Sequence, residues 1–417
     1  MINKLNKISK STLFKESIIY GFTNALYSGI PILILPLLLK VLEPADYGLV
    51  EFYRNLSLLL TPILGLSTVQ AITRFYFDLD KNDFKVFVSN IIYLHFFNSI
   101  IGSIIILLLS VFIKPEYFYI TTLCVIYFLF NQITEALLSI FRVEKKPKLY
   151  LIFRILNIIL DLAFLAFLYF FLSSFDWTYR VYPNVTAAVL VGILALIFFY
   201  RSGYFHKLNK IFLTKAIIYS SPLILHMISG YIMNIGDRFF ILYFLTEKDL
   251  GNYAVAYQLG MLVNFLYTSF NLAWVPTFFS LMKNEQYHKI NKIRSITYVG
   301  IILFSIFVIG GVSLALKYTS IFGKYNVDLS LIIIVSVAYI FNSMYKFEAN
   351  YYFYNKKTKK LSFITLGAAL ITIILNLVFI PIIGLYACAL ATLISSLFMY
   401  LLVVIYKNKG NESITKT

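Results

Sequence analysis

The chain has 417 residues, 60% of them hydrophobic and 13% charged, and its formal net charge is +17. This composition excludes an ordinary soluble protein, in which about a quarter of the residues are charged. Its 40 Phe and 33 Tyr exclude a disordered chain, and its two cysteines are too few for a disulfide scaffold. Lys and Arg lie between apolar stretches, so the positive charge indicates membrane topology rather than a nucleic-acid partner.

Twelve apolar windows of about 20 residues, the length of a membrane-spanning helix, follow one another along the chain. They do not alternate in polarity as the strands of a membrane β-barrel do, so the sequence predicts an all-α multi-pass membrane protein. Lys4, Lys7, Lys10 and Lys15 precede the first window as an uncleaved basic start. The windows are 16–39, 55–73, 86–113, 117–141, 149–174, 184–200, 216–236, 253–281, 295–316, 327–354, 361–380 and 385–406.

The basic residues between the windows predict the orientation. With a cytoplasmic N-terminus, most of the 36 Lys and Arg residues fall in cytoplasmic segments, as the positive-inside rule requires. The even number of windows then puts both termini in the cytoplasm. Arg154 and Lys346 are assigned to the interior of windows. The basic residues assigned to the outer loops are Lys40, Arg54, Lys114, Arg180, Arg238, Lys248, Lys317 and Lys324.

A short pattern, Leu-x-x-x-Asp-x-Gly, occurs twice, at 42–48 and at 245–251, with an offset of 203 residues. In each copy the Asp can cap the next helix, and the Gly permits a tight chain reversal at the membrane surface. An offset of half the chain predicts two six-helix bundles, 1–205 and 206–417. Repeats of six spans are a transporter design with the substrate path between the halves.

The sequence contains no constellation that predicts catalysis. The loops are too short to form a soluble domain, and a phosphate-binding GxxxxGK[ST] loop is not found. The four histidines and two cysteines have no zinc-site spacing. We therefore expect a protein that is not an enzyme and that uses neither a metal nor a cofactor.

Several motifs in order along the chain carry a family resemblance. They are Leu42 with 46–48, the segment 65–76, Pro222, the segments 237–241 and 251–257, Trp274 to Pro276 with Phe278 and Phe279, and the segment 376–384. In these residues the chain resembles the polysaccharide-exporter (Wzx-type) family of lipid-linked oligosaccharide flippases, in the multidrug/oligosaccharidyl-lipid/polysaccharide (MOP) superfamily.

The resemblance implies two six-helix bundles that form a V and work by alternating access. It implies movement of undecaprenyl-diphosphate-linked repeat units across the bacterial cytoplasmic (inner) membrane for O-antigen, capsule or exopolysaccharide synthesis. The expected partners are this lipid-linked oligosaccharide and membrane lipids, and the family also allows a polysaccharide polymerase and a chain-length regulator. Such a substrate needs cations for its diphosphate, and aromatic and amide groups for its sugars.

Four basic residues are candidates for substrate binding. Arg154 and Lys346 are predicted to face a central cavity and contact phosphate, although Arg154 could instead extend to the headgroups. Arg74 ends the second window, where it could bind an entering diphosphate or simply anchor the helix. Arg238 is expected at the outer end of the seventh window, where it could contact phosphate or form a local pair with Asp237.

Three acidic residues, Asp161, Asp237 and Glu348, are candidates for ion coupling. Asp161 follows Arg154 by two helical turns on one face, and a carboxylate at midspan costs about 2.5–3.5 kcal/mol, so it should face water or a partner. Glu348 and Lys346 point about 200° apart. Polar lining for sugars is expected from some of Tyr257, Tyr267, Tyr345, Tyr351, Tyr352, Asn24, Asn98, Asn131, Gln132, Asn157, Asn234, Asn264, Asn271, Asn342, Asn350 and Asn376.

Two other functions remain open at this point. A cation-coupled drug or metabolite antiporter of the same superfamily would favour an acidic cavity. The deep charges here are mixed in sign: they are Arg154, Lys346, Asp161, Glu135 and Glu348. Together with Arg74 and Arg238, they suit an anionic headgroup better. A membrane-bound acyl- or glycosyltransferase would need a positioned base, metal or nucleophile.

Overall fold

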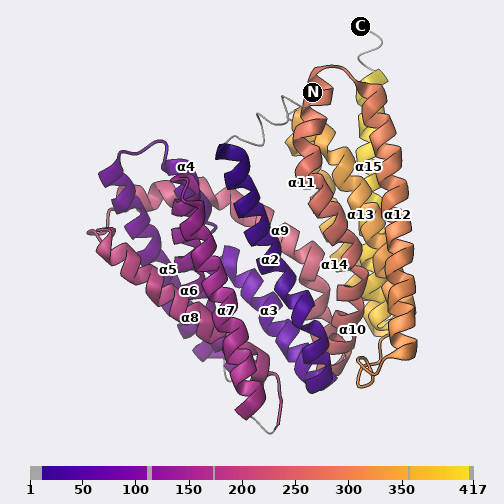
Figure 1. Cartoon of the computed structure of the whole chain (residues 1–417), viewed down its shortest axis with the longest axis horizontal. Helices are drawn as coiled ribbons and strands as arrows, with labels where there is room; N and C mark the ends of the chain where they lie inside the picture. The colour runs from indigo at the N-terminus through magenta and orange to yellow at the C-terminus, as the bar shows by residue number, and fades with distance from the viewer. Residues whose placement is uncertain (1–11, 110–114, 172–173, 356, 413–417) are drawn as a thin grey trace. The chain divides into compact units, whose positions relative to one another are not determined.

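The computed structural model describes residues 12–109, 115–171, 174–355 and 357–412, and their regular secondary structure is α-helical (Figure 1). The first helices are α2 (Thr12–Val41), α3 (Pro44–Leu64), α4 (Val69–Phe75), α5 (Lys81–Leu109), α6 (Pro115–Val143), α7 (Pro147–Phe171) and α8 (Thr178–Arg201). They are followed by α9 (Lys210–Phe244), α10 (Glu247–Gly260), α11 (Leu262–Lys283), α12 (Tyr287–Tyr318), α13 (Leu329–Tyr354), α14 (Thr358–Ile383) and α15 (Leu385–Glu412).

The helices confirm the all-α membrane class. Among the described residues, eight helices are long and apolar enough to cross a membrane, or up to ten if each of two bent helix pairs is one span. One such pair is α3 and α4, which meet at 49°. The number twelve stays a prediction. Lys4, Lys7, Lys10 and Lys114 lie outside the described residues.

Helix α3 begins earlier than its predicted window. Proline at the first helical position has the backbone angle that a helix needs and lacks only an N–H group that would have no partner there. The helix therefore starts at Pro44, eleven residues before the predicted start at 55. The charged residues Glu51 and Arg54 hid this first part from an interpretation based on hydropathy.

The repeated pattern starts helices, but its glycines do not make turns. Thr246 caps α10, and its side chain accepts a hydrogen bond from the Asp249 backbone N–H, while the Asp249 carboxylate accepts one from the Thr246 N–H. The Asp thus takes part in capping as predicted. Gly48 and Gly251 lie inside α3 and α10, so the predicted chain reversal at these glycines is wrong.

These two glycines instead allow two helices to touch. A Cβ atom built on Gly48 would lie 1.9 Å from the Glu247 carbonyl oxygen, and one on Gly251 would lie 1.9 Å from the Pro44 carbonyl oxygen. Pro44 and Glu247 each stand four residues before the glycine of their own copy. The two copies of the pattern therefore pack on each other through equivalent atoms, at a distance that only glycine permits.

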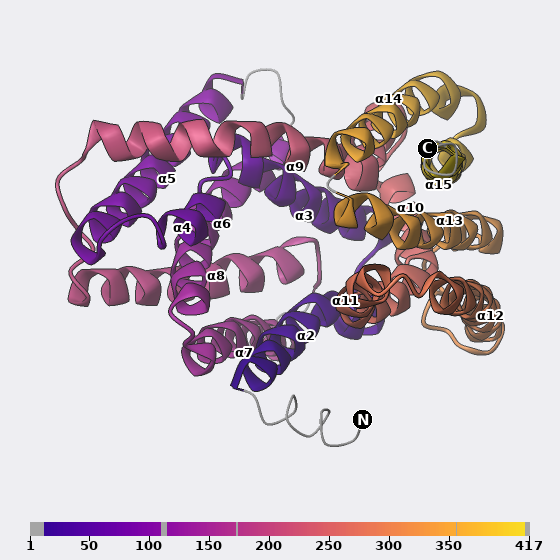
Figure 2. The ribbon, with the colours of Figure 1, turned by 90° about the horizontal axis from the view of Figure 1, so that it is seen from above.

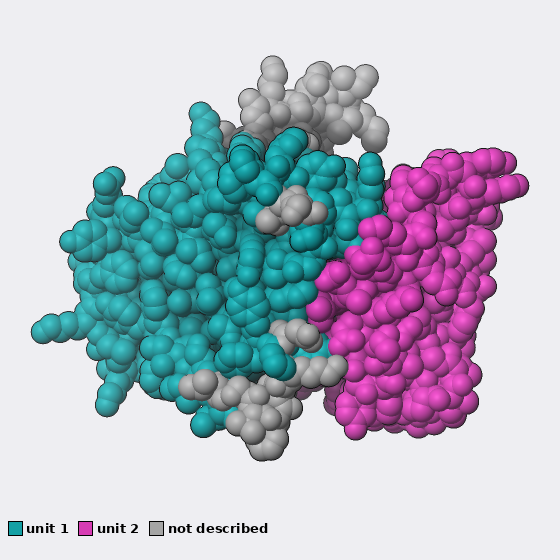
Figure 3. Space-filling view, turned by 90° about the horizontal axis from the view of Figure 1, so that it is seen from below, with its two compact units in different colours: residues 1–42, 52–228 teal, residues 43–51, 229–417 magenta. Residues whose placement is uncertain are grey.

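The chain divides into two compact units, residues 1–42 with 52–228 and residues 43–51 with 229–417 (Figure 3). We call these unit 1 and unit 2. The N-terminal part of α3 thus packs as part of unit 2. The predicted division into six-helix bundles at 205/206 stays a prediction.

Each unit has its own apolar interior. In unit 1, α6 packs against α5, α7 and α8 around buried rings such as Phe87, Phe141 and Phe199, and α2 packs against α7. In unit 2, α13 packs against α10, α11, α12 and α15, and α14 packs against α15 (Figure 2). The buried Tyr352 of α13 donates a hydrogen bond to the Val403 carbonyl of α15.

Candidate functional site

Arg154 on α7 is neutralised inside unit 1. Its Nη2 lies 2.7 Å from Oε1 of Glu135 on α6, and its side chain is 11% exposed. The guanidinium also lies over the ring of Tyr27, 4.4 Å from the ring centre. A charge that is paired and stacked in this way is held by the protein itself rather than by lipid headgroups.

Asp161, two turns further along α7, pairs with a different helix. Arg180 on α8 donates two hydrogen bonds to its carboxylate, of 2.7 and 3.0 Å, and both side chains are about nine-tenths buried. The bidentate geometry is the strongest form of this interaction. The assignment of Arg180 to an outer loop is therefore wrong, because its helix begins at Thr178 and its charge lies in the protein interior.

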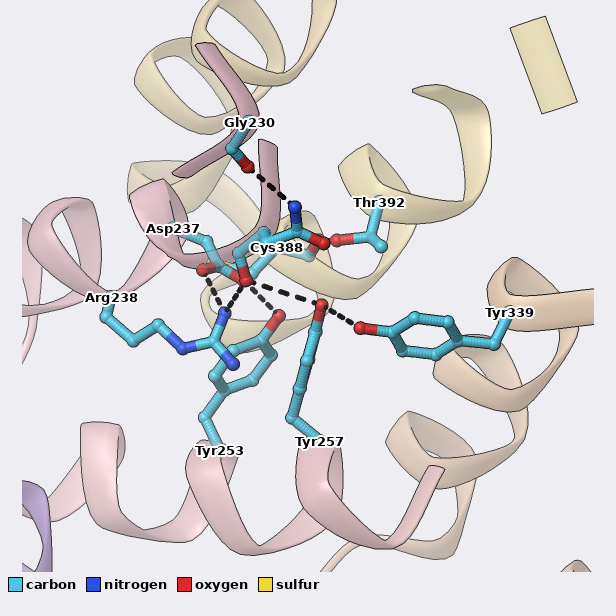
Figure 4. A network of polar contacts seen from close by, with 9 residues as sticks. Gly230, Asp237, Arg238, Tyr253, Tyr257, Tyr339, Cys388 and Thr392 are labelled. Carbon is cyan, nitrogen blue, oxygen red and sulfur yellow. Dashed lines mark hydrogen bonds and ion pairs between the residues drawn. The ribbon is translucent and has the colours of Figure 1, made fainter. Parts of the chain in front are cut away.

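Asp237 and Arg238 form a buried ion pair in unit 2 (Figure 4). Arg238 Nη1 lies 2.5 Å from Asp237 Oδ1, and both side chains are about 5% exposed. Since α9 continues to Phe244, these residues lie within the helix, and the assignment of Arg238 to an outer loop is wrong. Of the two roles predicted for Arg238, the structure contains the local pair with Asp237.

Tyrosines from two other helices surround this pair. Tyr253 on α10 donates a hydrogen bond of 2.5 Å to Asp237 Oδ2, and the Arg238 guanidinium lies 4.0 Å from the ring centre of Tyr257. The hydroxyls of Tyr257 and Tyr339, the latter on α13, are 2.8 Å apart (Figure 4). The cluster links α9, α10 and α13 through a network of polar contacts, in which Arg238 Nε is a buried donor without a hydrogen-bond partner among the described residues.

Lys346 on α13 differs from the other deep cations. Its ammonium donates a hydrogen bond of 2.8 Å to the side-chain amide oxygen of Asn264 on α11. Within the described ranges of the chain, no carboxylate lies at ion-pair distance from it. The recorded partner of Lys346 is therefore a neutral group.

Further amides continue the polar contact between α11 and α13. Asn350 donates a hydrogen bond of 3.1 Å to the Asn271 amide oxygen, and Tyr267 donates one of 3.2 Å to the same atom. Lys346 and Asn350 are four residues apart and so share a helix face, as do Asn264 and Asn271, which are seven apart. This face combines one cation with amide and phenol groups.

Glu348 lies on the other side of α13. Its Oε1 accepts a hydrogen bond of 3.0 Å from Tyr298 on α12 and lies 3.5 Å from Nη1 of Arg294. Its partners thus come from α12, whereas the partner of Lys346 comes from α11, in agreement with the predicted divergence of the two side chains. The two residues belong to different sites.

Arg74 is the most exposed candidate. It lies in the last turn of α4, and its guanidinium contacts Asp78 at 2.5 Å, with about half of the side chain exposed. Surface pairs of this kind contribute little to stability.

The family model for polysaccharide biosynthesis proteins matches residues 13–282, which is more than half of the chain. The chain belongs to the polysaccharide biosynthesis protein family. Two Haemophilus influenzae proteins are similar to it at 24% identity. The match to a membrane protein covers 92% of this chain and 95% of the relative, and the match to a protein of the lsg locus covers 66% and 68%.

Solved structures with a similar fold include those of transporters. A multidrug resistance MATE family transporter of the MOP superfamily, inward-facing, has a TM-score of 0.63 at 14% identity, with 96% of each chain covered. Lipid II flippase MurJ, in an inward closed conformation, also has a TM-score of 0.63, at 15% identity, with 95% of this chain and 87% of that chain covered. This member of the polysaccharide biosynthesis protein family therefore has the fold of a MOP-superfamily transporter, as predicted.

Sequence reasoning did not predict the contacts of three residues that lie at the buried charges of this family member. Arg180 carries no local signal, and only the requirement of a buried carboxylate for a partner points to it. Asn264 was one of many intramembrane amides. Glu51 is 3% exposed on α3 and accepts a hydrogen bond of 2.8 Å from Gln258 on α10. Pro44, as a helix-start signal, could have revealed that Glu51 lies in a helix.

Proposed function

We propose that this protein is a flippase that moves undecaprenyl-diphosphate-linked oligosaccharide repeat units across the bacterial cytoplasmic membrane by alternating access, for surface polysaccharide synthesis. Membership in the polysaccharide biosynthesis protein family supports the process, and the likeness to a lipid II flippase supports the type of cargo. The observation that carries the proposal is Lys346, a deep cation held by an amide and by no recorded carboxylate in the described chain.

The physical argument compares two deep cations. Arg154 shares its charge with Glu135, so a phosphate would have to compete with a carboxylate for it. Lys346 has only a neutral hydrogen-bond partner recorded, so its attraction for a diphosphate is not cancelled. That attraction is several times stronger in a protein interior than in water. The amide and phenol groups beside Lys346 can bind sugar hydroxyls.

The other candidates take secondary roles in this proposal. Arg74, on an exposed helix end, meets the diphosphate as it enters, and Arg154 and Arg238 contact phosphate when their carboxylate partners release them. Asp161, Asp237 and Glu348 are the carboxylates that can take up a coupling ion.

A cation-coupled drug antiporter is the second candidate, because the likeness to a multidrug transporter has the same TM-score as the likeness to the flippase. An antiporter for cationic drugs needs an acidic site rather than a deep lysine. The charge of the cargo therefore separates the two functions.

The test uses proteoliposomes that contain the purified chain and a fluorescent undecaprenyl-diphosphate-linked oligosaccharide. Lys346→Ala should reduce flipping at least tenfold, because a buried charge-assisted contact contributes about 1.5–3 kcal/mol. Lys346→Arg should retain part of it. Lys317→Ala, which removes an exposed lysine, is the matched control. Normal flipping by Lys346→Ala would falsify the proposal, and export of a cationic dye without lipid flipping would favour the antiporter.

The proposed orientation has its own test. A single cysteine at position 145, between α6 and α7, should react with a membrane-impermeant maleimide only after the cells are opened. Labelling of this position in intact cells would show that the orientation is opposite to the proposed one.

A further inference from the structure

Unit 2 contains a cavity of about 1070 Å³ on the side of α13 that carries Glu348. Its walls come from the end of α11, the beginning of α12, the end of α13 and α15. Ligand sites in proteins commonly measure about 300–1000 Å³, so this cavity is large enough for a small oligosaccharide. Lys346 is not among its lining residues.

The charges that line this cavity cancel. Lys283 and Arg294 supply two positive charges, and Glu285 and Glu348 supply two negative charges. A diphosphate would require a net positive lining, and a cationic drug would require a net negative one. The charge balance therefore favours a neutral ligand.

The remaining lining groups suit a ligand that has both hydroxyl groups and flat apolar faces. Five tyrosines line the cavity, among them Tyr298, Tyr351 and Tyr400, together with amide side chains such as Asn291. Tyrosine presents an apolar ring and a hydroxyl that donates and accepts hydrogen bonds. A lipid tail would find these polar groups costly to cover, because it cannot satisfy them.

The carboxylate in the wall is already oriented. Glu348 is 3% exposed and accepts a hydrogen bond from the Tyr298 hydroxyl, while Arg294 lies 3.5 Å from the same oxygen. A carboxylate held in this way presents charge-assisted acceptor sites in a fixed direction, which adjacent hydroxyls of a sugar ring can use.

A smaller pocket in unit 1 has a different lining. It measures about 530 Å³ and is lined by α5 and by residues of the segments that follow α4, α6 and α8. Two tyrosines and two lysines line it, and the Lys85 ammonium donates a hydrogen bond of 2.6 Å to the Ser202 carbonyl. This pocket lacks the set of aromatic and amide groups that characterises the cavity of unit 2.

We propose that the cavity between α11, α12, α13 and α15 is a binding site for a neutral carbohydrate. The inference rests on the proposed function for the source of that carbohydrate, which is the sugar part of the lipid-linked substrate. Unit 2 thereby uses two sides of α13, one with Lys346 for phosphate and one with Glu348 for sugar.

The experiment measures binding of free sugars, without lipid and without transport. Purified full-length protein in lipid nanodiscs is examined by saturation-transfer NMR with neutral hexoses and N-acetylhexosamines, and with hexuronic acids and inorganic pyrophosphate as anionic probes. The neutral sugars should give the strongest transfer. Tyr298→Phe and Glu348→Gln should each weaken the binding of neutral sugars about five- to tenfold. The first variant removes the hydroxyl that orients the Glu348 carboxylate, and the second removes the charged acceptor for the sugar hydroxyls.

Tyr243→Phe is the matched control, since Tyr243 lies on α9 and is 79% exposed. It should bind like the wild type. If Glu348→Gln does not fold, Tyr298→Phe, which removes a single oxygen atom, decides the question. Stronger transfer to the anionic probes, or unchanged binding of neutral sugars in folded Tyr298→Phe, overturns the inference. Flipping by the same preparation is measured separately, so a wild-type protein that flips lipid but does not bind neutral sugars rejects this site and leaves the proposed function standing.

Discussion

Unit 1 and unit 2 hold their buried charges in different ways. In unit 1, Arg154 and Asp161 each meet an oppositely charged residue on a neighbouring helix. In unit 2, Asp237 and Arg238 pair within one helix, Glu348 lies 3.5 Å from a partly exposed arginine of α12, and Lys346 donates a hydrogen bond to a neutral amide. The difference shows that a charge deep in the membrane is not by that position alone a ligand-binding group, because a charge that is neutralised by a partner can have a structural role.

The comparison predicts that charge removal harms the two units differently. In unit 1 it leaves a partner charge buried and unpaired, so stability falls. At Lys346 it leaves a neutral amide, so stability changes little and transport fails.

The largest effect should follow from breaking the interhelical pair of unit 1. Asp161→Ala leaves the Arg180 guanidinium buried without its carboxylate, and such a loss costs about 3–5 kcal/mol. The melting temperature of the purified protein measures it. The double variant Asp161→Ala with Arg180→Ala should recover part of the loss, and an unchanged melting temperature in the single variant would show that the pair is not buried in solution.

The two copies of the repeated pattern should respond alike to a larger residue. Gly48→Ala and Gly251→Ala each place a methyl group 1.9 Å from a carbonyl oxygen, so α3 and α10 must separate at a cost of about 1–3 kcal/mol. Gly310→Ala is the control, because no neighbouring atom lies within 4 Å of its Cβ position. Thermal unfolding compares the three. Equal stability of Gly310→Ala and Gly251→Ala would contradict the close contact.

Lys346→Gln tests the other side of the comparison. It keeps a donor for Asn264 and removes the charge, so the unfolding free energy should change by less than about 1 kcal/mol while flipping is lost. Arg154→Gln should lower the melting temperature instead, because Glu135 then loses its partner. A large destabilisation by Lys346→Gln would indicate a structural rather than a substrate-binding charge.

The smallest effect concerns a cap at the start of α13. The Tyr386 hydroxyl, together with the Ser330 backbone N–H, lowers the pKa of the Asp328 carboxyl below its usual value. The ionised cap therefore stabilises the fold above pH about 4, and this contribution disappears as the pH falls through the lowered pKa. Asp328→Ala should cost about 1 kcal/mol at pH 7 and less near pH 3. A cost that does not depend on pH would exclude the charge as its cause.

Some features were predictable because they depend on residues close together in the chain. Each predicted window falls on a helix or on two consecutive helices, as 55–73 does on α3 and α4. The divergence of Lys346 and Glu348 follows from the helical angle of about 100° per residue. The start of α3 was missed because charged residues lower the hydropathy of a segment in which one of them, Glu51, is in fact buried against α10.

The sequence by itself determined the helical membrane class, the approximate position of the helices and the presence of Arg154, Asp161 and Lys346 within apolar helices. These follow from hydropathy, helix length and the cost of charge in hydrocarbon, which are local properties. Only the tertiary structure decided which charges are cancelled. Arg180 reaches Asp161 and Glu135 reaches Arg154 between helices that follow one another in the chain, whereas Lys346 meets an amide 82 residues away, and in each case helix packing brings the groups within 3 Å of each other. Electrostatic energy depends on that distance and on burial, and neither can be read from the order of residues along the chain.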